Sequence, residues 1–231
     1  RIAGICFNHQ SNCLGGRAGS DRCDFDRMTR GLGERWMIVD TEFKIYPAIA
    51  RNHPPYFATR ALVDEHAIKP EDVRRVVVHG MQMPLVDDYD PQGAVDAQFS
   101  LPHAVVMAIL REPLGARIFS DERLFDPTVR ALLRKVELVH VPERDAIFFN
   151  EQRLIYTVRV ELNSGASHTK EVEFPRDQPR LGWRELEQKF RALADGILPA
   201  PQIEQAIERV GTLDALDDLR PLVRAMCPDS R

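Results

Sequence analysis

The sequence predicts an α+β fold in which a small mixed unit, an antiparallel hairpin with helices, precedes a run of helices. Apolar and polar residues alternate over 156–162 and again at 172–174, and the turn Asn163-Ser164-Gly165 lies between these stretches. This period of two is typical of a hairpin with one solvated face. After Pro175 and Pro179 the apolar residues recur at helical spacing instead, which predicts a helical C-terminal part.

Length, composition and net charge limit the kinds of protein and partner that we expect. The 231 residues could form one large domain or two small ones, and 44% hydrophobic with 29% charged residues is ordinary for a globular chain. A formal net charge of -4 argues against a nucleic-acid partner bound through a basic surface. No apolar run approaches the roughly 18 residues of a membrane helix, and no signal-peptide pattern opens the chain. We therefore expect a cytoplasmic protein with no membrane partner. Because the sequence starts at Arg1 and not at a methionine, we also expect a fragment or a processed piece.

The first 24 residues have little pattern of regular structure. They contain residues of zinc-ligand type, namely Cys6, His9, Cys13 and Cys23. Paired Cys-x-x-Cys spacing is missing, so we expect an irregular segment with free thiols and no metal.

The middle of the chain predicts alternating helices and short strands. A helix is expected over 55–66, with Pro55 in its first turn, and the β-branched run 73–78 predicts a strand. Residues 81–96 are expected to form a loop. Its aspartates fit no calcium-loop spacing, so we expect them to be solvated; they are Asp87, Asp88, Asp90 and Asp96.

A strongly apolar helix is expected over 97–110, with Asp96 as its N-cap and Pro102 near its first turn. A short helical piece should begin at Ser120. Asp126-Pro127 predicts the cap and first position of another helix, and 136–139 predicts a strand.

One loop, residues 43–55, contains most of the candidate binding and catalytic side chains. Lys44, Arg51 and His53 lie within ten residues of one another, and prolines at 47, 54 and 55 exclude a regular helix through them. Cationic side chains on such a loop favour an anionic ligand, most simply a carboxylate, and the alternative is a solvated surface turn. His103, at the start of the apolar helix, is a possible addition. The remaining histidines of the predicted domain are expected at the surface or at strand ends; they are His66, His79, His140 and His168.

Phosphate-binding glycine loops, the His-Glu-x-x-His zinc helix and the serine nucleophile elbow are all missing from the sequence, so no cofactor is expected. Lysine and histidine can both transfer protons near neutral pH. Beside a bound carboxylate they would suit elimination of water, decarboxylation or epimerisation.

Several motifs then resemble, in the same order, those of the MmgE/PrpD family. They are Gly31-Leu32-Gly33-Glu34-Arg35-Trp36, Phe43-Lys44-x-Tyr46-Pro47 with His53, Ala97-Gln98-Phe99-Ser100-Leu101-Pro102, Phe119-x-Asp121-Glu122 and Lys189-Phe190-Arg191-Ala192. The resemblance covers about residues 25–226. It implies a lyase or isomerase that acts on small di- or tricarboxylates without a metal, such as 2-methylcitrate dehydratase, cis-aconitate decarboxylase or iminodisuccinate epimerase.

The resemblance also implies a domain arrangement and partners. An all-helical domain is built from the N-terminal half and the C-terminal tail, and an α+β domain lies between them in sequence. We thus expect an irregular segment and helical-domain remnant at 1–45, the α+β domain at 46–180, and C-terminal helices of the incomplete helical domain at 181–231. The chain resembles the C-terminal half of the enzyme, so its partner would be a complementary N-terminal chain or a second copy in a homodimer.

Residue by residue, Lys44 and His53 match the active-site lysine and histidine of the family. The resemblance therefore implies that both are catalytic and that Lys44 also binds the substrate. Arg51 departs from the pattern, which has arginine where this chain has Ala50. His103 stands where tyrosine is common, and the tyrosine that some decarboxylating members carry is missing from 83–86. The missing tyrosine makes decarboxylation less expected, and the leading hypothesis is a hydro-lyase of the 2-methylcitrate dehydratase type. The alternative class is a non-catalytic assembly protein.

Overall fold

The structure is a computed structural model that describes residues 29–34, 36, 38, 43–81, 83, 87–113 and 115–228. The chain divides into two compact units, Arg1–Phe43 and Lys44–Arg231. In the first unit the described residues include a turn over 29–34, in which the Leu32 amide donates to the Thr29 carbonyl (3.2 Å). The zinc-type residues Cys6, His9, Cys13 and Cys23 lie outside the described residues.

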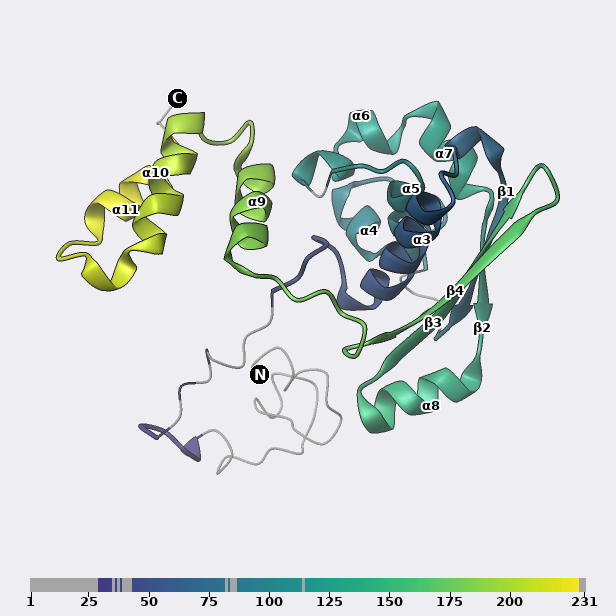
Figure 1. Ribbon diagram of the computed structural model, residues 1–231, viewed down its shortest axis with the longest axis horizontal. Helices are drawn as coiled ribbons and strands as arrows, with labels where there is room; N and C mark the ends of the chain where they lie inside the picture. Colours follow the sequence, from purple (N-terminus) through teal and green to yellow (C-terminus); the bar gives the residue numbers. More distant parts are fainter. Residues whose placement is uncertain are drawn as a thin grey trace. The chain divides into compact units, whose positions relative to one another are not determined.

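The strands of the described part form a four-stranded sheet in the order β2-β1-β3-β4 (Figure 1). These strands are β1 (Val73–Gly80), β2 (Val136–His140), β3 (Leu154–Leu162) and β4 (Ser167–Phe174). β3 pairs antiparallel with both β1 and β4, which confirms the predicted hairpin. β1 and β2 pair in parallel, because the helices between them return the chain to the same end of the sheet.

Helices make up most of the remaining regular structure, and the mixture confirms the α+β class. The α-helices are α3 (His53–Glu65), α4 (Ala94–Phe99), α5 (Leu101–Ile109), α6 (Asp121–Leu124), α7 (Pro127–Leu133), α8 (Pro142–Glu151), α9 (Trp183–Ala194), α10 (Ala200–Gly211) and α11 (Arg220–Ala225). Short 3₁₀ turns are η3 (Ala50–Asn52), η4 (Pro70–Asp72), η5 (Ala116–Phe119) and η6 (Leu213–Ala215).

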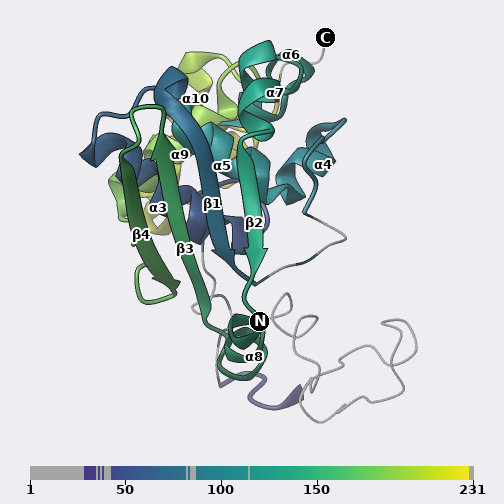
Figure 2. The same cartoon turned by 90° about the vertical axis from the view of Figure 1, so that its right-hand side faces the viewer.

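The main core lies between the sheet and helices α3 and α5, which Figure 2 shows behind the strands. Val76, Val78, Tyr156 and Val158 point to this side and are at most 1% exposed. Gly80 lets the Tyr156 ring lie flat against β1, since a Cβ at Gly80 would be 2.1 Å from Tyr156 Cδ1. The opposite face of the β3–β4 hairpin is polar, as predicted. Its ion pairs include Arg144–Glu171, Arg153–Glu173 and Arg159–Glu161.

The predicted helix 97–110 is in fact two helices, and Asp96 is not its cap. α4 begins after Gly93, while Ser100 is the N-cap of α5 and its Oγ accepts the His103 amide (3.0 Å). The break follows from Pro102, which has no N–H to donate to the carbonyl of Gln98. That carbonyl instead accepts the backbone amide of Ile49 (3.0 Å). Asp126 is the predicted cap of α7, because its carboxylate accepts the amides of Thr128 and Val129.

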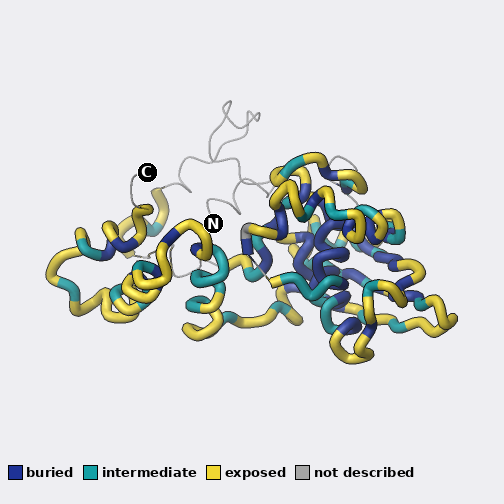
Figure 3. Tube along the Cα trace, turned by 90° about the horizontal axis from the view of Figure 1, so that it is seen from above, coloured by how far each residue is buried: buried dark blue, intermediate teal, exposed yellow. Residues whose placement is uncertain are grey.

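The C-terminal helices have a small core of their own. Ala194, Leu198 and Ile203 are buried there, with Phe190 and Ile207 packed against them. Figure 3 shows that few residues of α9–α11 are buried, whereas α3 and α5 are mostly buried. The boundary predicted near residue 180 stays a prediction. Among the described helices, none is long and apolar enough to span a membrane.

Candidate functional site

The loop predicted to bind an anion is a shaped turn that leads into α3. Lys44 is exposed at its start, and the Ala48 amide donates to the Tyr46 carbonyl (2.8 Å). η3 follows, and His53 is the first residue of α3. Pro54 and Pro55 fit in the first turn of this helix, where backbone N–H groups have no helical partner. The local sequence thereby fixes where His53 enters the fold.

The imidazole of His53 is held neutral. His53 is 3% exposed, and its Nε2 has no hydrogen-bond partner among the described residues. Burial lowers the pKa of His53 to about 4, the charges of Lys44 and Lys189 act in the same direction, and the carbonyls of Tyr46 and Ala48 oppose them. At neutral pH this histidine is therefore a proton acceptor.

Tyr46 forms the wall beside His53. Its ring stacks on Tyr56 (centroids 4.5 Å apart) and meets the His53 ring edge-on (6.1 Å). Burial raises the pKa of Tyr46, so its hydroxyl stays protonated. This buried hydroxyl has no partner among the described residues, which leaves a hydrogen-bonding group free inside the site.

His103 lies in the same aromatic cluster. Its ring stacks on Phe119 (5.7 Å), which in turn contacts Tyr46 (6.3 Å). His103 is fully buried, and burial lowers its pKa to about 4. Neither ring nitrogen has a partner in the described part of the chain. A direct role of His103 toward a ligand stays a prediction.

Arg51 is directed into the protein interior. It is 4% exposed, and its Nη2 donates to a carboxylate oxygen of Asp87 in a buried ion pair. The other Asp87 oxygen accepts the Met83 amide (2.8 Å). Through Asp87, Arg51 holds the loop after β1. Its contact with a ligand stays a prediction. The expectation that Asp87 is solvated was wrong, because its partner Arg51 is 36 positions away and sequence spacing does not reveal such a contact.

Two predicted motifs meet at this turn. Besides the Ile49–Gln98 bond, the Asn52 side-chain amide donates to the carbonyls of Gln98 (3.5 Å) and Phe99 (3.2 Å). The end of α4 therefore positions η3 and, through it, His53. Asn52 is a positioning residue that sequence spacing did not identify.

Lys189 of α9 is a second residue that the site prediction omitted, although it lies in the Lys189–Ala192 motif. It is half-buried, and burial together with the Lys44 charge lowers its pKa. Among the described residues neither Lys44 nor Lys189 forms an ion pair with a carboxylate.

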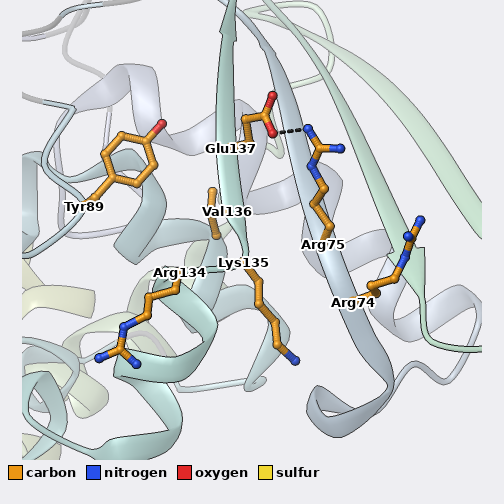
Figure 4. Close-up of a pocket in the computed structure, with 7 residues that line it drawn as sticks. All are labelled: Arg74, Arg75, Tyr89, Arg134, Lys135, Val136 and Glu137. Atoms are coloured by element: carbon orange, nitrogen blue, oxygen red, sulfur yellow. Dashed lines mark hydrogen bonds and ion pairs between the residues drawn. The ribbon is translucent and has the colours of Figure 1, made fainter.

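Another cluster of cations lies away from this site. A pocket of about 470 Å³ is lined by Arg74, Arg75, Tyr89, Arg134, Lys135, Val136 and Glu137 (Figure 4). Arg75 pairs with Glu137, Arg74 pairs with Glu161, and Lys135 Nζ donates to the Val73 carbonyl (2.5 Å). Arg74, Arg75 and Lys135 therefore already have partners, and the pocket contains none of the predicted site residues.

Comparison with known proteins bears on the same residues. The model of the MmgE/PrpD C-terminal domain matches residues 46–213. The chain belongs to the MmgE/PrpD family. Its relatives in this family include the cis-aconitate decarboxylases of Mus musculus (26% identical; 83% of this chain, 41% of the relative) and Homo sapiens (28%; 79% and 39%). A cis-aconitate decarboxylase of Aspergillus terreus is 26% identical over 88% of this chain and 44% of its own length. The chain spans about two fifths of the length of these MmgE/PrpD relatives.

Proposed function

We propose that this chain is the C-terminal half of an MmgE/PrpD lyase that acts on a small di- or tricarboxylate. The supporting observation is the turn from Lys44 to His53, where an exposed ammonium lies near a buried, neutral imidazole. Relatives named cis-aconitate decarboxylases support a tricarboxylate substrate.

In the proposed reaction, Lys44 contacts a carboxylate of the substrate and His53 transfers a proton. Contact with a cation stabilises the negative charge that develops when a carbon next to a carboxylate loses its proton. Neutral His53 accepts that proton as general base. In a hydro-lyase the carbon–oxygen bond then breaks, and the hydroxyl leaves as water with a proton from a general acid.

Decarboxylation is a second candidate, favoured by the names of the relatives. Here the bond to the departing carboxylate breaks and carbon dioxide leaves, and the carbanion that remains takes up a proton that a general acid delivers from solvent. The hydro-lyase reaction is favoured because the tyrosine of some decarboxylating members is missing from 83–86. The sequence has only Tyr89 between β1 and α4, and the Tyr89 hydroxyl accepts the Leu138 amide at β2 (3.0 Å). Product analysis with 2-methylcitrate and cis-aconitate distinguishes these reactions.

The Lys44 role is tested with Lys44→Ala, using exposed Lys69→Ala as the matched control. Calorimetric titration with cis-aconitate should show binding weakened roughly tenfold or more by Lys44→Ala, because a charge-assisted bond is lost. Turnover, measured after addition of a complementary N-terminal half, should fall about 10²-fold or more in His53→Gln. Unchanged binding and turnover in Lys44→Ala would refute its role.

The complementary half is part of the proposal. The segment from α9 to α11 exposes large apolar side chains, among them Trp183, Ile197, Leu213 and Val223. Such surfaces favour association, either with the missing half of the helical domain or with a second copy of the chain. The alternative function, a non-catalytic assembly protein, would use the same surface without any effect of Lys44→Ala on a ligand.

A further inference from the structure

Helix α9 reaches the candidate site through close backbone packing. A Cβ placed on Gly115 would lie 2.9 Å from the Ala192 carbonyl oxygen of α9. Gly115 leads directly into η5, which ends at Phe119, and the Phe119 ring contacts Tyr46 beside His53. Lys189 is three residues before Ala192, so it lies one helical turn from this contact.

The charges at this place are not balanced within the described part of the chain. Further along α9, Arg191 is paired with both Glu187 and Glu204. Lys189 is half-buried, yet it and Lys44 have no carboxylate partner among the described residues. Burial and the Lys44 charge lower the pKa of Lys189, and the charges of both lysines help to lower the pKa of His53. Holding like charges together is unfavourable unless an anion compensates them.

We propose that Lys189 is a third cationic member of the Lys44–His53 site and binds a second carboxylate of the substrate. The inference rests on the proposed function and specifies it: the ligand carries at least two carboxylates, of which Lys44 takes one and Lys189 another. Lys189 is then a residue that selects polycarboxylates over monocarboxylates.

The first test needs no ligand. The pKa of His53 is measured by NMR titration of its ring in the wild-type chain, in Lys189→Gln and in Arg184→Gln, which removes an exposed charge from the same helix. Removing a nearby positive charge should raise the His53 pKa by at least a few tenths of a unit in Lys189→Gln. The control should leave it unchanged.

The second test compares probes with decreasing charge. Calorimetry at constant ionic strength measures the affinity for cis-aconitate, maleate and crotonate, which carry three, two and one carboxylates. Lys189→Gln should weaken binding of cis-aconitate and maleate roughly tenfold and leave crotonate nearly unchanged. Lys44→Gln should weaken all three.

The outcomes separate the two proposals. If Lys189→Gln changes neither the His53 pKa nor the preference for polycarboxylates, while Lys44→Gln weakens binding, the inference fails and the proposed function stands. If the wild-type chain binds none of the three acids, both fail. A raised His53 pKa together with a lost preference would support the inference.

Discussion

At the scale of residues, the candidate site combines exposed charge with buried neutral imidazoles. Lys44 is open to solvent, whereas His53 and His103 are at most 3% exposed. Burial makes the charged form of an imidazole costly, so both rings stay neutral at pH values where free histidine begins to protonate. The same burial links the stability of the protein to pH.

We expect the free energy of unfolding to fall between pH 6.5 and about pH 4. In this window the unfolded chain protonates both histidines at the ordinary pKa of 6.5, while the folded chain protonates them only near 4. Stability therefore rises with pH here, by about 1.4 kcal/mol per pH unit for each histidine. Urea unfolding at a series of pH values measures the slope. His103→Phe should reduce this slope by about 1.4 kcal/mol per pH unit; an unaltered slope would contradict the assignment.

At the scale of elements, close approaches between backbone and rings fix how the sheet and its helices pack. Gly80 of β1 faces Tyr156 of β3, and the Tyr156 hydroxyl donates to the Met81 carbonyl (3.3 Å). A larger residue at position 80 would have to displace a buried ring. Because the Met81 carbonyl begins the loop that Arg51 and Asp87 hold, a shift of Tyr156 would reach the site.

Gly80→Ala should therefore destabilise the fold by about 1–3 kcal/mol, the usual cost of overpacking a core. Gly93→Ala is the matched control, since a Cβ at Gly93 would meet only Asp96 Oδ2, at 3.8 Å. Thermal unfolding followed by circular dichroism compares the two. Equal melting temperatures for the two variants would show that the ring moves aside without cost.

At the scale of the whole chain, the exposed apolar residues of α9–α11 predict association. Val223→Glu and Trp183→Glu place charges on side chains that are 53% and 51% exposed. They should shift the chain toward monomer in light scattering, because a buried unpaired charge opposes an interface. Arg184→Glu, an exposed polar position on α9, is the control. A wild-type chain that stays monomeric at high concentration would contradict this prediction.

Local patterns in the sequence predicted much of this fold. Alternation predicted β3 and β4, the β-branched run predicted β1, and Asp126-Pro127 predicted the start of α7. The break at Ser100 was missed, although Pro102 is a local signal for it; the bond from the Ile49 amide to the Gln98 carbonyl, far away in sequence, could not be predicted from local pattern. The parallel pairing of β1 with β2 was not predicted either, because no local signal records which strands meet.

The candidate site was predicted in part, for the same physical reason. Lys44 and His53 lie on one turn, so spacing alone brought them together. Asp87 and Lys189 reach the neighbourhood of that turn only through long-range packing. Local sequence therefore could not place the charges of Asp87 and Lys189 near this turn.

The order of strands in the sheet has a consequence for synthesis. β1 lies between β2 and β3, so a nascent chain that has emerged only as far as residue 152 can complete one side of β1 and leaves its other edge open. An open apolar edge invites pairing with other chains. The β3–β4 hairpin, made of local contacts, closes this edge as soon as it emerges. Ribosome stalling or truncation before residue 154 would thus be more hazardous than loss of the C-terminal helices.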